Sequence, residues 1–209
     1  MSIVWYFDFI SPFAWLHWPK VKALAASQPV TLRPIVFAGL LDHYGHKGPA
    51  EIPSKREFSY RYVVWRAQQA RQPLRFPPAH PFNPIAALRL CIAAGSSVAA
   101  VDAIFEWIWA QGRAGDSAEA LAPLAARLGI ADIAGAIADP AVKAQLKANY
   151  DAALAEGVFG VPTLSLDGRL FWGDDAHAFA LAYLDNPALW DAPEMQHVVS
   201  LPMAVARRI

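Results

Sequence analysis

A short apolar run that changes directly into a helical pattern is the feature that most constrains how this chain can fold. Residues 3–9 are almost all β-branched or aromatic, which is typical of a buried strand. The strand pattern stops at Ser11-Pro12, and a helical period begins at Phe13. Backbone N–H groups and the helix dipole favour an anion at a helix N-terminus. The hydroxyl of Ser11 can donate a hydrogen bond there, to a thiolate that a small molecule supplies.

Strand patterns are found at both ends of the chain. Residues 30–37 are apolar or alternating, so the chain begins strand, helix, strand, which predicts parallel pairing through a right-handed crossover. Residues 157–166 lead into a further strand. Asp167-Gly168 is a hairpin turn signal, and residues 170–172 form the expected return strand. Gly173-Asp174-Asp175 then open a helix, and the whole pattern predicts an α/β protein.

The middle of the chain is expected to be helical. Glycines and prolines in residues 39–53 predict a long loop or lid. Asn83 before Pro84 is typical of an N-cap followed by proline at the first helical position. Residues 190–209 show no clear regularity, and we expect them to wrap over the body or over a partner subunit. Helical periodicity covers residues 54–70, 85–94, 97–111, 117–128 and 140–155.

Composition narrows the classes of function. The 209-residue chain has 18 Lys and Arg against 18 Asp and Glu, so no net charge favours nucleic acid or an anionic membrane surface. No apolar run suits a membrane span and no basic segment precedes the first strand, so we expect a cytoplasmic protein. The histidines lack metal-ligand spacing, and no metal is expected. The single cysteine, Cys91, excludes a dithiol redox pair.

Several short motifs point to a family. They are Phe7-Asp8-Phe9-Ile10-Ser11-Pro12-Phe13, Lys47-Gly48-Pro49, Pro53-Ser54-Lys55-Arg56, Phe76-Pro77-Pro78 and residues 83–89, 157–163 and 171–175. In this order they resemble 2-hydroxychromene-2-carboxylate isomerases and kappa-class glutathione transferases, over residues 4 to 184. The resemblance implies a thioredoxin-like α/β domain with an inserted all-helical domain, the DsbA and kappa-class architecture. The expected boundaries are 1–40 and 157–190 for the thioredoxin-like domain, 41–156 for the insertion and 191–209 for a tail.

The resemblance also implies an activity. Members of the isomerase family use glutathione to interconvert 2-hydroxychromene-2-carboxylate and trans-o-hydroxybenzylidenepyruvate in aromatic catabolism. We therefore expect a glutathione-dependent isomerase whose substrate is a small aromatic carboxylic acid, assembled as a homodimer. Ser11-Pro12-Phe13-Ala14 occupy the positions where thiol–disulfide oxidoreductases carry Cys-x-x-Cys. Because a free thiol with a pKa of about 8.5 is mostly protonated at neutral pH, the site has to stabilise the thiolate of glutathione.

The resemblance assigns the glutathione site to three segments. Ser11, with Pro12 and Phe13, is expected to activate the thiolate. Val161 is expected to pair its backbone with the cysteinyl unit, next to a cis peptide bond at Pro162.

The remaining assignments concern the γ-glutamyl end of glutathione and the substrate. The γ-glutamyl end is expected at Trp172-Gly173-Asp174-Asp175, since an aspartate suits an ammonium group and a helix N-terminus suits a carboxylate. His46 stands where relatives have an asparagine that contacts glutathione. Lys47, Lys55 and His80 are expected to face the substrate, and a basic residue of the loop would hold its carboxylate.

Other readings of the same residues stay open. A serine before proline is commonly only an N-cap, and two aspartates at a helix start are commonly only caps. A kappa-type glutathione transferase or peroxidase would use the same pocket. A DsbA-like protein without catalytic activity would instead bind extended peptides at Val161.

Overall fold

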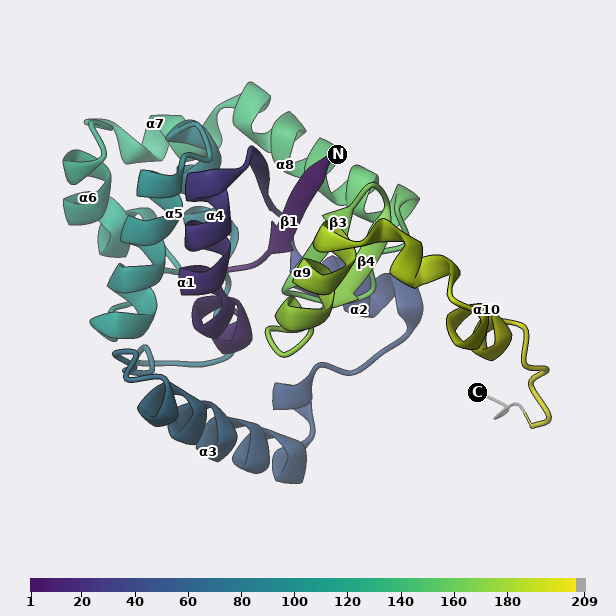
Figure 1. Ribbon diagram of the computed structural model, residues 1–209. Coiled ribbons are helices and arrows are strands. Elements are labelled where there is room, and N and C mark those ends of the chain that lie inside the picture. The colour runs from purple at the N-terminus through teal and green to yellow at the C-terminus, as the bar shows by residue number, and fades with distance from the viewer. Residues whose placement is uncertain (206–209) are drawn as a thin grey trace.

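The computed structural model describes residues 1–205, and its centre is a four-stranded sheet (Figure 1). β1 (Ile3–Phe7) pairs parallel with β2 (Val30–Pro34) and antiparallel with β3 (Thr163–Leu166). β3 forms a hairpin with β4 (Arg169–Trp172), so the strand order is β2-β1-β3-β4. The predicted parallel pair and hairpin are both confirmed.

β1 is buried on both faces, and its alternate residues enter two different cores. Trp5 and Phe7, whose ring centroids are 4.4 Å apart, belong to the larger core, which the sheet shares with the helices. Val4 and Tyr6 belong to a smaller core on the other face. A strand that is covered on both sides needs apolar residues at every position, which explains the continuous apolar run.

An aromatic ring of the helical block ties the larger core together. Phe105, the last residue of α5 (Val98–Phe105), is fully buried. Its ring centroid lies 4.7 Å from that of Phe9, 5.8 Å from Phe7 and 6.0 Å from Trp5. It also lies near Trp15 and Trp18 of α1 (Pro12–Ser27), the helix that connects the parallel strands.

The chain between β2 and β3 is mostly helical, as predicted. Helix α7 (Ile133–Ala138) was not predicted, since its six residues are too few to show a helical period. In Figure 1, α3 (Pro53–Gln69) lies at the bottom of the view, and its Val63 and Ala67 pack with Leu16 of α1. Before α5, the chain forms α3 (Pro53–Gln69) and α4 (Ile85–Ala93). After α5, it forms the π-helical turn η2 (Glu106–Ala110), α6 (Ala118–Arg127), α7 (Ile133–Ala138) and α8 (Pro140–Ala155).

The loop expected at residues 39–53 is largely helical instead. α2 (Phe37–Tyr44) begins where the second strand was expected to end, and the 3-10 turn η1 (Pro49–Glu51) follows it. Packing decides this outcome, because Leu40 is fully buried against the smaller core. The glycines and prolines of the segment therefore separate short helices.

The C-terminal region also differs from the prediction. The helix expected to open at Asp174 begins later, as α9 (His177–Asp185). Regular structure continues in η3 (Pro187–Asp191) and α10 (Pro193–Val199), and α10 extends away from the body in Figure 1. No helix within residues 1–205 has both the length and the hydrophobicity needed to cross a membrane.

A buried chain of polar side chains links α1 to α9. Trp5 Nε1 donates to Nδ1 of His17, and Nε2 of His17 lies 3.0 Å from Nδ1 of His177. A neutral His17 therefore donates from Nε2, because its Nδ1 is already an acceptor. Burial lowers the pKa of both histidines, which favours the uncharged form of each.

We predict that Phe105→Ala lowers the free energy of unfolding by about 3–5 kcal/mol, because it leaves a cavity between five aromatic rings. Urea denaturation followed by circular dichroism measures the loss. Phe58→Ala is the control, since that ring is 68% exposed. Equal effects of the two substitutions would contradict the role of Phe105 as the link between sheet and helices.

Candidate functional site

Ser11 is the N-cap of α1 and lies at the carboxyl end of β1. Its Oγ accepts a hydrogen bond from the N–H of Ala14 at 3.2 Å, as the N-cap reading predicts. Its backbone carbonyl accepts from Ala14 and Trp15. Within residues 1–205 the hydroxyl hydrogen of Ser11 has no acceptor. Ser11 is 6% exposed, so this donor is largely desolvated.

The backbone of the junction is fixed by Asp8, a residue to which the sequence analysis gave no role. Its two carboxyl oxygens accept from the N–H groups of Ile10, at 3.0 Å, and Phe37, at 2.9 Å. Its carbonyl accepts from the N–H of Ser11. Complete burial raises the pKa of Asp8 to about 7, although these hydrogen bonds favour the charged form. The sequence signal that could have identified Asp8 is the position of an acidic residue directly after a buried strand.

A second segment of the site starts at a cis peptide bond between Val161 and Pro162. Tyr6 of β1 is paired with Thr163, so continuing this antiparallel register places Val161 level with Asp8. Neither the N–H nor the C=O of Val161 has a hydrogen-bond partner within residues 1–205. Buried backbone groups are nearly always paired, so this free edge suits an extended, peptide-like ligand.

The third segment, residues 172–175, is attached to the cis proline. The N–H of Gly173 donates to the carbonyl of Pro162 at 2.8 Å. Trp172 is 55% exposed and lies over Gly160, where an added Cβ would come within 2.5 Å of its Nε1. Glycine at position 160 is therefore required by the approach of this indole. Asp175 is exposed.

Asp174 differs from Asp175 because it is buried and already paired. Its carboxylate lies 2.5 Å from Nη2 of Arg66 and 3.9 Å from Nζ of Lys20, which also donates to its backbone carbonyl. Burial raises the pKa of Asp174, and the two cations oppose that shift. Arg66 and Lys20 were missed by the sequence analysis, since no local signal marks a partner more than 100 residues away.

Helix α3 forms one side of the site. It supplies Arg66 to Asp174, and the ring of Tyr62 lies 6.3 Å from that of Phe13 in the first turn of α1. Phe13 is half-buried in this contact, and Pro12 beside it is buried.

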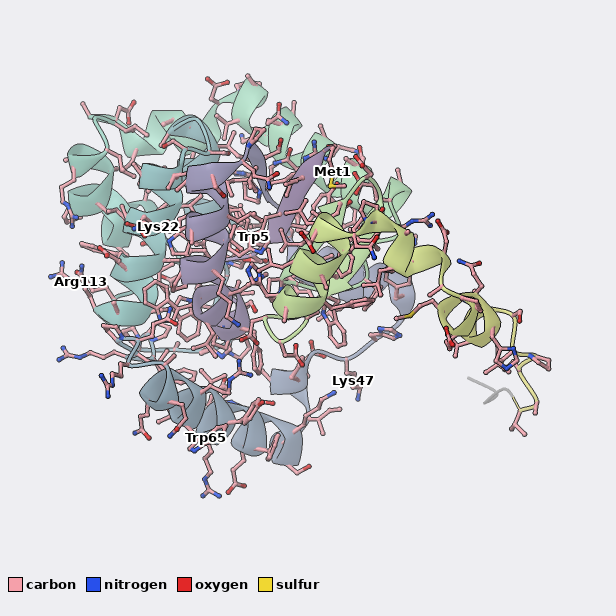
Figure 2. All side chains as sticks on the ribbon, viewed as in Figure 1. Met1, Trp5, Lys22, Lys47, Trp65 and Arg113 are labelled. Carbon is pink, nitrogen blue, oxygen red and sulfur yellow. The ribbon has the colours of Figure 1, made fainter. Side chains whose placement is uncertain are left out.

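The basic residues predicted to face the ligands lie on the surface of the middle segment. His46, Lys47 and Lys55 are exposed, and within residues 1–205 none has an ion pair. Figure 2 shows Lys47 on the segment that leads from the body to α3, far from Trp5 in the core. Among the described residues no His, Cys, Asp and Glu side chains gather as a metal site.

His80 does lie at the junction, although it is not free. Its Nε2 lies 2.8 Å from the carbonyl oxygen of Ile10, and its Nδ1 lies 2.5 Å from the hydroxyl of Tyr60. Both ring nitrogens therefore have partners inside the protein. Burial lowers the pKa of His80.

Comparison with known proteins agrees with this architecture. The family model of the DSBA-like thioredoxin domain matches residues 2–185. The 2-hydroxychromene-2-carboxylate isomerase of Pseudomonas putida is 29% identical over 187 residues, which cover 84% of this chain and 90% of that protein. The isomerase of the same name from Sphingobium xenophagum is 28% identical over 191 residues, covering 88% of this chain and 97% of that protein.

Solved structures show the same fold. A selenomethionine form of 2-hydroxychromene-2-carboxylate isomerase superimposes with a TM-score of 0.74 at 25% identity, covering 93% of this chain and 99% of that one. A cytosolic disulfide reductase, DsbM, from Pseudomonas aeruginosa gives a TM-score of 0.60 at 19% identity, covering 88% of this chain and 99% of that one. The thioredoxin-like fold expected from the sequence is thereby confirmed.

We predict that the stability of the protein depends on pH through Asp8. Its pKa is about 7 when folded and near 3.8 when unfolded, so the folded state binds more protons between these values. The contribution of Asp8 to stability is therefore fully present below about pH 4 and is lost as the pH rises through about 7. Urea denaturation at several pH values should show a flatter profile for Asp8→Asn than for the wild type. Parallel profiles would contradict the raised pKa.

Proposed function

The chain belongs to the family of DSBA-like thioredoxin domains, and we propose that it is a glutathione-dependent isomerase that interconverts 2-hydroxychromene-2-carboxylate and trans-o-hydroxybenzylidenepyruvate. The relatives of that name, at 28–29% identity, support the reaction class. The observation that carries the glutathione dependence is the set of free donors and acceptors at the cis proline and at the start of α1. The chain has no redox pair of its own, since its one cysteine is buried elsewhere.

Unused polar groups fit the cysteinyl part of glutathione. The N–H and C=O of Val161 can form two hydrogen bonds to a peptide-like unit, as an added strand does. The hydroxyl of Ser11 can then donate to the sulfur, because its oxygen is an acceptor only for Ala14. The N-terminus of α1 adds the positive end of its dipole, so the pKa of the bound thiol falls.

Charges of both signs fit the γ-glutamyl end. That end carries an ammonium group and a carboxylate. Asp174 and the exposed Asp175 supply negative charge, while Lys20 and Arg66 supply positive charge beside Asp174. A zwitterionic group can therefore pair with both kinds of partner at residues 172–175.

Bound glutathione would supply a sulfur nucleophile that adds reversibly to the conjugated carbon of the substrate, so that rotation about a single bond can precede release. The protein then has two tasks. Ser11 stabilises the negative charge on sulfur before addition and again as the sulfur leaves. The contacts of Val161 hold the sulfur at one position, which lowers the entropic part of the barrier. Ser11 acts here as a hydrogen-bond donor and not as a nucleophile, since no base is hydrogen-bonded to its hydroxyl within residues 1–205.

We predict that Ser11→Ala lowers glutathione-dependent isomerisation by about two orders of magnitude, the usual effect of removing one donor to a developing negative charge. The measurement is the rate of conversion of 2-hydroxychromene-2-carboxylate followed by absorbance. Ser97→Ala and Ser117→Ala are matched controls, because both serines cap a helix with the same 3.2 Å bond. Each control should lose stability and keep its activity. A wild-type rate for Ser11→Ala would refute the role of the hydroxyl.

We predict that glutathione is regenerated in every turnover, because the sulfur must leave again for isomerisation. The measurement is the concentration of free glutathione during the reaction, with an electrophilic acceptor such as an aryl halide in a parallel sample. A stable conjugate with loss of glutathione would instead indicate a kappa-type transferase. Binding of extended peptides without any binding of glutathione would indicate a peptide-binding protein that is not catalytic.

A further inference from the structure

A groove with a volume of about 640 Å³ lies between α2, α4 and α8. The residues of α8 that line it run from Lys143 to Tyr150 at three- and four-residue spacings, so this helix presents one face to the groove. A space of this size accommodates a small organic molecule. Within residues 1–205, no residue assigned to the candidate glutathione site lines the groove, so the proposed function leaves it unexplained.

Part of the lining is apolar. Leu146 is buried, and Val36, Ile85 and Tyr150 are partly buried. The hydroxyl of Tyr150 donates to the carbonyl of Gly39 at 2.9 Å, which holds the ring against α2. Contact with these side chains would remove a flat hydrocarbon ring from water, so the groove favours a ligand with an apolar body.

Arg89, which also lines the groove, carries a charge that lacks a counter-ion. Its Nε is buried and has no hydrogen-bond partner within residues 1–205. Its Nη1 donates to the carbonyl of Ile137 at 3.4 Å, which is long for a hydrogen bond. Among the described residues no carboxylate oxygen lies within 4.0 Å of the guanidinium. Buried charges are normally paired, so the protein leaves Arg89 in need of an anion.

The other charged residues of the groove are exposed and come from two helices. Lys147 already pairs with an aspartate of its own helix, whereas Lys143 has no ion pair within residues 1–205. α2 contributes the exposed Asp42 and His43. Arg89 and Lys143 therefore outweigh the single carboxylate of Asp42, which favours a ligand with one anionic group and opposes a second one.

We propose that this groove is a second binding site, for a small aromatic carboxylate whose charged group pairs with Arg89 and whose ring lies against Leu146 and Tyr150. A guanidinium presents its donors in a planar fork that matches a carboxylate. A bare inorganic anion would leave the apolar lining in water, and an uncharged ring would leave Arg89 without a partner. The site goes beyond the proposed function, and neither proposal depends on the other.

The test is a calorimetric titration of the full-length protein with 2-naphthoate, an aromatic carboxylate of suitable size. We expect saturable binding. 2-Naphthamide has the same ring without the charge, and sulfate has charge without the ring. Each should bind at least about tenfold more weakly, because each engages only one part of the groove. Absence of saturable naphthoate binding, or equal affinity for sulfate or the amide, would overturn the proposal.

Variants then place the bound naphthoate in the groove. Arg89→Met removes the charge and keeps an apolar stem, so it should weaken naphthoate binding at least about tenfold. Arg127→Gln is the matched control, since Arg127 is an exposed arginine of α6 that does not line the groove, and it should bind as the wild type does. Equal affinity of Arg89→Met and the wild type would refute the site.

Thermal unfolding without ligand separates binding from structural support. Removing a desolvated charge that has no counter-ion should leave the Tm of Arg89→Met equal to that of the wild type or higher. A lower Tm with unchanged naphthoate affinity would instead show that Arg89 only supports α7 through Ile137.

Two substitutions of exposed residues test the charge argument without disturbing buried groups. At low salt, Lys143→Gln should weaken naphthoate binding and Asp42→Asn should tighten it, by about twofold or more each. A damaged groove would not bind more tightly, so the second variant is independent of any loss of stability. Unchanged affinity in both variants would contradict an anion bound among these charges.

Discussion

The burial of β1 on both faces is the constraint on which the rest of the structure depends. Pairing with β2 on one edge and β3 on the other fixes the strand, and two cores fix its side chains. The junction at its end therefore starts from a rigid position. Asp8 then binds the N–H groups of Ile10 and Phe37, so the same carboxyl group sets the start of both neighbouring helices. Donors held in this way need no rearrangement when charge develops.

Neutral and charged groups lie at different ends of the candidate site. Around Ser11 the groups are hydroxyl, peptide and the imidazole of His80, whose pKa is lowered by burial, and the nearby carboxyl group of Asp8 has a pKa raised to about 7. A partly protonated Asp8 repels a thiolate less than a full carboxylate would. The full charges, Arg66, Lys20 and Asp174, lie together at the other end of the candidate glutathione site. This separation favours an anion at the junction and a zwitterion at residues 172–175.

Elements with strong local signals could be predicted, and those that depend on packing could not. The run at residues 3–9 and the turn at Asp167-Gly168 gave β1 and the hairpin, since period and turn chemistry are local. α2 was missed because its start depends on a bond from Phe37 to Asp8. α10 was missed because its seven residues are too few to show a helical period. Residues 206–209 of the tail lie outside the described residues.

By itself the sequence determined the chemistry at three short segments: a hydroxyl before a helix, a proline before a strand, and two aspartates after a strand. It also determined that no redox pair exists. Only the tertiary structure decided which partners these segments have. Arg66 reaches Asp174, and Trp109 reaches Phe9 across 100 positions of sequence. Such contacts leave no periodic trace, because they are set by how an inserted helical block packs against the sheet and not by the residues next to the site.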